Sequence, residues 1–210
     1  MIDLDQLGTR VRDEFQVRHA AREKGLALHR DVIRNSANAI RAAHRGEADT
    51  AGTLIADAQR LLQEIEVVLG PHPEIYYAGF IHDCQKEFAE ANLTVALLSD
   101  RPLPDPDALG VHLPAYLNGL AEALGEVRRH LLDLVRQGAL DRCEPLLQRM
   151  DDIYMLLVTI DYPDAITAGL RRSTDVARGI LEKTRGDLTV AIRQRDLERA
   201  LRSLEDKLSS

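Results

Sequence analysis

The stretch CQKEFAEANLTVALL, residues 84–98, reads as one helix and indicates the fold class of the chain. Helix formers and apolar residues make up most of it, and it contains no glycine or proline. Glu87 and Glu90 lie three residues apart within these apolar surroundings. An unpaired buried carboxylate is costly, and a proton, a cation or a metal ion usually neutralises it. The stretch therefore predicts a helix together with a site that needs a positive charge.

Helix-forming residues dominate the rest of the chain as well. Runs of β-branched residues are short, and no alternating strand pattern with hairpin turns occurs. Glycine and proline mark helix ends at Gly46, at GPHP (residues 70–73) and in the loop 100–112. Asp141 and Glu144 have the spacing of a capping box that starts a helix. We expect an all-α chain with helices over about 3–45, 49–69, 74–99, 114–136, 141–159 and 164–207.

Length and composition favour a single domain over residues 1–210. The chain has 210 residues, of which 45% are hydrophobic and 29% charged, enough for one sizeable core. The first and last helices would each be about 60 Å long, and helices of that length usually pack against other chains. No apolar run approaches the roughly 18 residues of a membrane span, and the N-terminus lacks a signal-peptide pattern, which predicts a cytoplasmic protein. Cys84 and Cys143 lack metal-type spacing, so reduced, buried thiols are expected.

Positive charge is concentrated near the N-terminus. The net charge is −7, yet residues 10–45 hold nine Lys or Arg and only four Asp or Glu. At 100° per residue, an apolar stripe of this helix lies beside a basic stripe. The apolar stripe consists of Val11, Phe15, Leu26, Ile33 and Ile40. The basic stripe consists of Arg12, His19, Arg30, Arg34, Arg41 and Arg45. It is either a solvated face or a surface for a phosphate backbone, whose oxygens match the planar fork of arginine.

A second acidic face is expected on the helix over 114–136. Glu122 and Glu126 share one side of it, as Glu87 and Glu90 do on their own helix. Two such helices brought together would supply the hard oxygen ligands that suit Mg²⁺ or Mn²⁺, and so a route to metal-assisted phosphodiester hydrolysis. The alternative is an ordinary helix surface, in which Glu126 pairs with Arg129 three residues later.

Five segments carry a resemblance to a known family. They are AREKGLALHRDVIRNSANAIRAAHRG (21–46), YY (76–77), QKEFAEA (85–91), AYLNGLAEALGEVRR (115–129) and DAITAGLRRSTDVARGILEKTRGDL (164–188). Together they resemble the translin family and, within it, an archaeal relative of translin-associated factor X (Trax), the catalytic partner of translin. The resemblance spans nearly the whole chain in order, apart from the loop at 100–112.

The resemblance implies an all-α, translin-like bundle of about six to seven helices, assembled into a hollow octamer that binds RNA inside. It also implies Mg²⁺-dependent RNA cleavage by two glutamates of an ExxE motif and an acid of a later helix. Glu87 and Glu90 match the ExxE, and Glu122 stands where Trax carries an aspartate. These three are the expected catalytic residues and ligands of Mg²⁺, or of Mn²⁺ in its place. The residues that fall where the family places part of its RNA-binding lining are Arg30, Arg34, Arg41 and Arg45.

Three functions are compatible with these patterns. The leading hypothesis is a Mg²⁺-dependent endoribonuclease that cleaves single-stranded or short duplex RNA inside a homo-octamer. The second is a non-catalytic translin-like protein that binds single-stranded RNA or DNA. The basic stripe favours it, and Glu122 in place of an aspartate leaves room for it. The third is a helical bundle that holds a metal ion or an anion without any RNA. The three differ in what they predict for RNA and metal binding.

Overall fold

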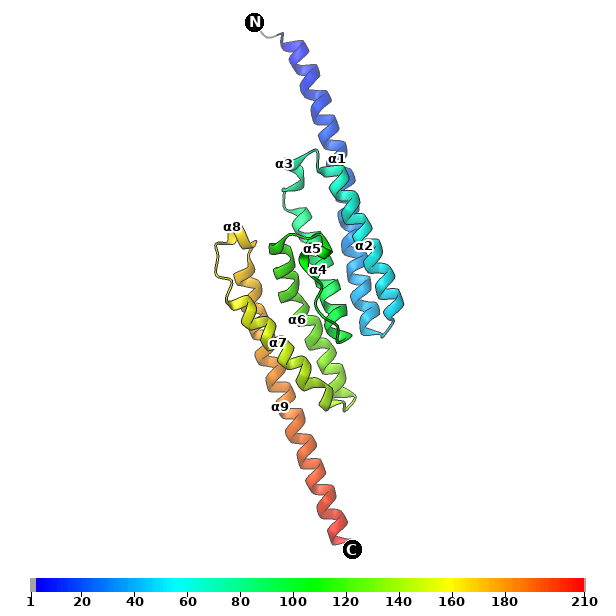
Figure 1. Cartoon of the computed structure of the whole chain (residues 1–210), viewed down its shortest axis with the longest axis vertical. Coiled ribbons are helices and arrows are strands. Elements are labelled where there is room, and N and C mark those ends of the chain that lie inside the picture. The colour runs from blue at the N-terminus through cyan, green and yellow to red at the C-terminus, as the bar shows by residue number, and fades with distance from the viewer. Residues whose placement is uncertain (1–2, 210) are drawn as a thin grey trace.

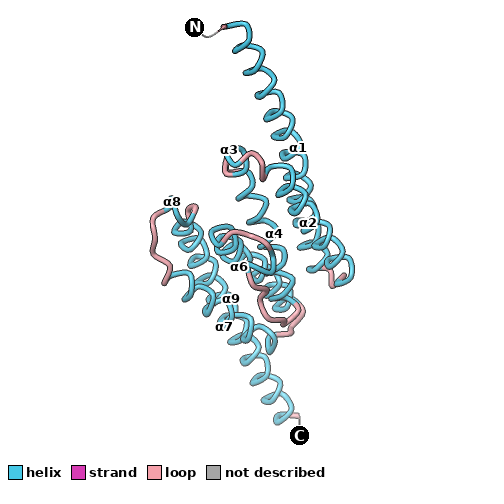
Figure 2. Tube along the Cα trace, turned by 45° about the horizontal axis from the view of Figure 1, so that its top comes forward, coloured by secondary structure: helices cyan, strands magenta, loops and turns pink. Residues whose placement is uncertain are grey.

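Helices are the only regular secondary structure in the part of the chain that the structure describes. A computed structural model describes residues 3–209, and these form nine α-helices and one 3-10 helix, with no β-strand among them (Figure 1, Figure 2). This confirms the predicted all-α fold with long first and last helices. The helices are α1 (Leu4–His44), α2 (Ala48–Leu69), α3 (Pro73–Tyr76), α4 (Phe80–Leu98), α5 (Pro106–Leu109), α6 (Leu113–Arg136), η1 (Leu140–Arg142), α7 (Cys143–Val158), α8 (Asp164–Thr167) and α9 (Leu170–Leu208).

Two of the predicted helices are each interrupted by a turn. The helix expected over 74–99 divides into α3 and α4, and Gly79 between them has a φ of 101°, which strongly favours glycine. The helix expected over 164–207 divides into α8 and α9, because Ala168 and Gly169 both adopt the left-handed conformation. Both predictions of one continuous helix were therefore wrong. The turn before α9 matters for the site, since it places the start of that helix against α6.

The predicted capping box at the start of α7 is also absent. A short 3-10 turn, η1, precedes the helix, and no side chain caps its first turn. Asp141 instead accepts a hydrogen bond from the Arg195 guanidinium at 2.8 Å. The tertiary contact with α9 thus replaces the local interaction that the spacing of Asp141 and Glu144 predicted.

The helices pack side by side around one main apolar core. α1 and α2 form an antiparallel pair, α4 lies against α1 and α6, and α6 also contacts α7 and α9 (Figure 1). α4 and α6 therefore lie in the middle of the bundle. Burying each large apolar side chain in its core contributes about 1.5–3 kcal/mol to stability. The largest fully buried side chains are those of Val32, Ile65, Leu69, Phe88, Leu93, Leu120, Leu124, Leu131, Leu134, Met150, Leu157 and Leu170.

Two helical ends project from the bundle. The first half of α1 and the last part of α9 extend from its opposite ends (Figure 1). α2 has 22 residues and α1 has 41, so α2 covers only the second half of α1 when it turns back along it. Val11 and Phe15 are accordingly 37% and 60% exposed, and their predicted place in the apolar core stripe is wrong for this chain. The buried face of α1 runs through Leu28, Val32 and Ile40.

Two smaller expectations concern the thiols and the membrane. Cys84 and Cys143 are both free and buried, as predicted. No helix within residues 3–209 combines the length with the apolar character that crossing a bilayer requires.

Candidate metal centre

The two central helices approach each other unusually closely at Gly119. A Cβ atom at this position of α6 would lie 2.7 Å from the carbonyl oxygen of Lys86 and 2.9 Å from the backbone nitrogen of Glu90. Only glycine allows the backbones of α4 and α6 to come this near. Glu122 follows Gly119 by three residues, about one helical turn, and the close crossing therefore brings its side chain beside α4.

Three carboxylates from α4 and α6 form a compact group, here called the acidic cluster: Glu87, Glu90 and Glu122. One oxygen atom of each lies within 4.8 Å of the others, and all three side chains are partly buried. The structure thus brings together the three residues that were predicted as catalytic residues and metal ligands. Glu126, predicted on the same face as Glu122, lies outside this group.

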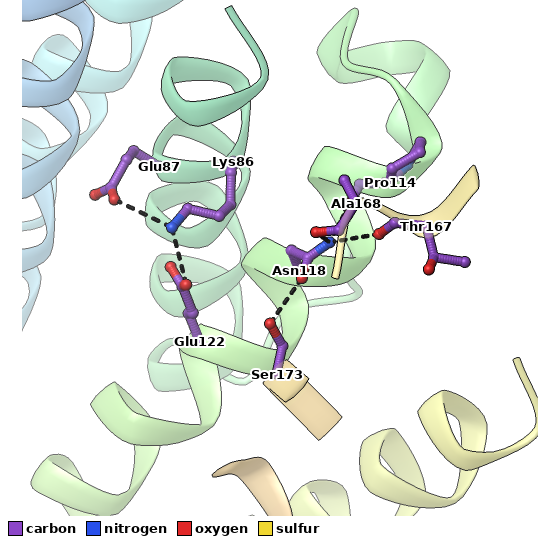
Figure 3. Close-up of polar contacts among 8 residues, drawn as sticks. All are labelled: Lys86, Glu87, Pro114, Asn118, Glu122, Thr167, Ala168 and Ser173. Atoms are coloured by element: carbon purple, nitrogen blue, oxygen red, sulfur yellow. Dashed lines mark hydrogen bonds and ion pairs between the residues drawn. The ribbon is translucent and has the colours of Figure 1, made fainter. Parts of the chain in front are cut away.

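A lysine that the sequence did not single out neutralises part of the cluster. Lys86 Nζ lies 2.8 Å from Oε1 of Glu122 and 3.6 Å from Oε1 of Glu87 (Figure 3). Burial alone would lower the pKa of Lys86, but the hydrogen bond and charge of Glu122, with Glu87 and Asp83, outweigh burial and raise it. Lys86 is therefore a cation at neutral pH and occupies the position of a counter-ion between two helices.

Burial and crowding disfavour the charged form of the glutamates on α4. Burial, followed by the charges of Glu87, Glu122 and Glu126, raises the pKa of Glu90 to about 8, although Lys86 opposes this shift. The pKa of Glu87 is also raised, chiefly by burial, which the charge of Lys86 offsets only in part. Glu90 thus holds a proton at neutral pH unless a further positive charge enters the cluster.

A histidine from α1 orients Glu126, the carboxylate that lies outside the acidic cluster. His44 Nε2 and Glu126 Oε2 are joined by a hydrogen bond of 2.6 Å, and the His44 side chain is only 5% exposed. This hydrogen bond lowers the pKa of Glu126. The predicted ion pair between Glu126 and Arg129 also exists, at 3.8 Å, but His44 is the closer partner. Sequence reasoning missed His44 because it lies 82 residues from Glu126.

A pocket of about 660 Å³ opens beside the acidic cluster. Asn118, one turn before Glu122, holds the chain leading into α9 against α6. Its amide nitrogen donates to the Pro114 carbonyl at 2.8 Å and to the Thr167 carbonyl at 3.0 Å, while Ser173 Oγ donates to its Oδ1 at 2.7 Å (Figure 3). The pocket therefore has one wall from α4 and α6 and another from the start of α9. Its lining residues are His82, Asp83, Lys86, Glu90, Asn118, Ala121, Glu122, Ala168, Gly169, Arg172, Ser173, Val176 and Ile180.

The four arginines predicted to bind RNA are all exposed, three of them on α1 and Arg45 at its C-cap, and none of them lines this pocket. Arg34 pairs with Asp31 at 3.0 Å, and Arg45 pairs with Glu47 at 2.7 Å. Arg30 and Arg41 form no salt bridge with any residue in 3–209. The basic stripe is thus partly neutralised, and two of its four predicted RNA-binding residues keep an uncompensated charge.

The donor set of the acidic cluster fits a hard divalent cation. Mg²⁺ is a hard cation that prefers oxygen ligands, and one or two carboxylates with water and phosphate usually complete its shell. One oxygen atom of each of the three glutamates lies within 4.8 Å of the others, so the carboxylates converge on a common point. A divalent ion would also offset the charges that raise the pKa of Glu90. Glu87, Glu90 and Glu122 are the residues that would hold Mg²⁺ or Mn²⁺.

Metal affinity is expected to rise with pH, because an ion at the cluster must displace the proton of Glu90. With the Glu90 pKa at about 8, binding below that pH releases one proton. The affinity for Mn²⁺ should then increase up to about tenfold per pH unit and level off above about pH 8. Calorimetric titration at several pH values, in buffers of different ionisation enthalpy, measures both the affinity and the released proton.

Two variants sharpen this measurement. Glu90→Gln should weaken Mn²⁺ binding and flatten its pH dependence, since no carboxyl proton is left to displace. Asp83→Asn is the matched control: Asp83 lies on the same helix and lines the same pocket but is not part of the acidic cluster. Asp83→Asn should keep the pH dependence of Mn²⁺ affinity seen in the unaltered protein. An affinity of the unaltered protein that does not change with pH would contradict the assignment of Glu90 as a ligand.

Comparisons with known proteins give several close matches over most of the chain, although no protein-family model matches it. An uncharacterized protein of Methanocaldococcus jannaschii is 30% identical over 192 residues, covering 90% of this chain and 85% of that protein. The AfC3PO–duplex RNA complex superposes with a TM-score of 0.81 at 31% identity, over 92% of this chain and 98% of that one. AfC3PO itself superposes with a TM-score of 0.80 at 31% identity, over 92% of this chain and 99% of that one. Apo-NeC3PO superposes with a TM-score of 0.74 at 18% identity, over 91% of this chain and 98% of that one, which is a likeness of fold alone.

Proposed function

The chain belongs to the translin family, and on that premise we propose that it is a Mg²⁺-dependent endoribonuclease that binds and cleaves single-stranded or short duplex RNA. AfC3PO, which is 31% identical over 92% of this chain, was solved in complex with duplex RNA. This likeness supports RNA as the ligand. The cleavage activity rests on the acidic cluster.

The observation that carries the proposal is the meeting of three carboxylates from two helices at the edge of an open pocket. Glu87, Glu90 and Glu122 would hold the ion, with Mn²⁺ as an alternative to Mg²⁺. A divalent ion held there would supply Lewis-acid chemistry toward a phosphodiester and an attacking water. Glu122 stands where Trax carries an aspartate, and its longer side chain reaches both the α4 glutamates and Lys86, which supports its role as a ligand.

Lys86 and His44 would support the reaction in two different ways, the first by contacting the substrate and the second through the charge near the cluster. Lys86 lines the pocket as well as contacting the cluster, so its ammonium group can donate to a non-bridging phosphate oxygen once the carboxylates have another counter-charge. His44 holds Glu126 in place behind the cluster and keeps its pKa low. The resulting negative charge favours occupation of the cluster by a cation.

We also propose that the protein works as a homo-oligomer, with the octamer as the expected form. The projecting ends of α1 and α9 carry large apolar side chains that the described chain does not cover, including Phe15 at 60% exposed and Leu197 at 60% exposed. Apolar residues at this density along unsupported helices favour packing against further copies of the chain.

A non-catalytic function is the alternative, namely binding of single-stranded RNA or DNA. The exposed and unpaired charges of Arg30 and Arg41 favour it, because arginine binds backbone phosphates without reading sequence. Such binding should weaken steeply with salt, as released counter-ions provide much of its free energy.

Incubating the purified protein with labelled single-stranded RNA in Mg²⁺ and in EDTA separates these functions. We expect fragments in Mg²⁺ only, because the carboxylates cannot act on a phosphodiester without the ion. RNA that is shifted on a native gel but uncut in both buffers would favour the binding protein. Metal binding without any RNA binding would contradict both and leave a metal-holding bundle.

A further inference from the structure

The pocket beside the acidic cluster has a basic wall that the proposed mechanism does not use. Arg172, in the first turn of α9, lines this pocket together with Glu90 and Glu122. Its side chain is exposed and makes no hydrogen bond or ion pair with any residue in 3–209. Lys86, the other lysine or arginine of the lining, is already engaged with Glu122 and Glu87. Among the described residues that line the pocket, Arg172 is therefore the cation free to receive an anion.

The fold anchors the start of α9, which carries Arg172, against α6. The hydrogen bonds of Asn118 to Thr167 and Ser173 anchor both sides of the turn that leads into α9 (Figure 3). Asn118 and Glu122 are four residues apart on α6, which corresponds to about 6 Å along the helix axis. Arg172 precedes the anchored Ser173 directly. The backbone at Arg172 is thus anchored to the same stretch of α6 that carries Glu122, and its side chain lines the pocket with Glu90 and Glu122.

The charge balance of the pocket suits a phosphate once a divalent ion is present. Together, the pocket and the acidic cluster carry four carboxylates, from Asp83, Glu87, Glu90 and Glu122, and two basic side chains, from Lys86 and Arg172. A divalent cation at the cluster, held by three ionised glutamates, cancels the excess of two negative charges. A phosphate at Arg172 then meets no net negative charge in the pocket. The planar guanidinium of arginine offers two parallel donors to phosphate oxygens.

The same face of α9 changes character beyond the arginine. Val176 and Ile180 follow Arg172 by four and eight residues, so they lie on one side of the helix, and both line the pocket. Val176 is 57% exposed. Ser173 contacts Asn118 and Ile180 lies beside Gly125, so this apolar face of α9 runs opposite the part of α6 that carries Glu122. An apolar wall of this kind suits a ribose or a base rather than a second phosphate.

We propose that Arg172 forms a subsite for the RNA phosphate adjacent to the one held at the acidic cluster, and so positions the strand for cleavage. The inference rests on the proposed function for the reaction that it serves, but the phosphate contact itself can be measured without cleavage. Arg172 acts here as a positioning residue. The contact is made equally before and during the reaction, so its loss should raise KM more than it lowers kcat.

The test compares Arg172→Ala with Arg171→Ala in the full-length protein. Arg171 is the neighbouring arginine, exposed and without a side-chain partner in 3–209, but it does not line the pocket. We expect Arg172→Ala to raise KM in Mg²⁺, and Kd for single-stranded RNA in Ca²⁺, an ion of the same charge, by about five- to tenfold. The slope of log Kd against log salt should become shallower by about 0.7, the value for one lost phosphate contact on a single strand. Arg171→Ala should change neither quantity appreciably.

A neutral linkage in the RNA tests the partner of Arg172 directly. A single methylphosphonate next to the cleaved bond should weaken binding of the unaltered protein by the same factor as Arg172→Ala, and should cost the variant nothing more. Equal effects of both arginine variants, or no effect of Arg172→Ala on Kd and salt slope, would overturn the subsite. RNA that is never cut but whose binding depends on Arg172 alone would refute the nuclease and retain the subsite. Failure to bind RNA at all would remove both.

Discussion

RNA cleavage is expected to slow by roughly a thousandfold when Glu87 is replaced by alanine, because one of three carboxylate ligands is lost and metal ions contribute several kcal/mol to stabilising the transition state. Glu87 and Glu90 project from neighbouring turns of α4 toward Glu122, so two carboxylates remain in the variant. Lys86 also loses one of its two acidic neighbours. Single-turnover cleavage in excess Mg²⁺ measures the loss.

Two further results distinguish a catalytic defect from a structural one. Affinity for RNA in EDTA should be undiminished in Glu87→Ala, since removing a carboxylate does not reduce attraction to phosphates. Asp83→Asn, one turn earlier on α4 and outside the acidic cluster, should cleave at close to the normal rate. If Glu87→Ala cleaves as fast as the unaltered protein, the cluster is not the catalytic site.

The site was predictable where local spacing and family resemblance agree. Glu87 and Glu90 are three residues apart on one helix, which is enough to place them side by side. Helical periodicity placed Glu122 and Glu126 on one acidic face, but only the resemblance selected Glu122 as the third ligand. The contribution of Gly119 could not be read from the sequence, since it depends on how closely two helix backbones approach.

Partners that lie far apart in the chain were the residues that sequence reasoning missed. Lys86 contacts Glu122 across 36 residues and His44 contacts Glu126 across 82. Helical periodicity assigns a face to each side chain but does not specify which helix covers that face. The same limit explains Phe15: its stripe was identified as apolar, but α2 is too short to cover it.

Helix boundaries were predictable wherever glycine or proline follows a long periodic segment, as at the end of α1. The turns inside the predicted helices 74–99 and 164–207 were not, because AGF and AGL read locally like helix with one tolerated glycine. Tertiary packing decides those positions. The anchoring of the turn before α9 by Asn118 shows how, since its amide bonds to a backbone carbonyl 49 residues away.

Replacing Gly119 with alanine is expected to lower the free energy of unfolding by about 2–3 kcal/mol and to weaken Mn²⁺ binding markedly. The new methyl group would meet two backbone atoms, at 2.7 Å and 2.9 Å, and backbone cannot rotate away as a flexible side chain can. Alanine's better helix propensity, up to about 1 kcal/mol, offsets only part of this strain. α4 and α6 must therefore separate, and Glu122 moves away from Glu87 and Glu90.

Gly125→Ala supplies the matched control on the same helix. A Cβ at Gly125 would meet only Cδ1 of Ile180, at 3.8 Å, which is ordinary van der Waals contact. This variant should gain about 0.5–1 kcal/mol from helix propensity and bind Mn²⁺ as the unaltered protein does. Chemical denaturation and calorimetric Mn²⁺ titration of both variants separate helix propensity from helix separation. If Gly119→Ala were as stable as Gly125→Ala and bound the ion equally well, the close crossing of α4 and α6 would not be what assembles the acidic cluster.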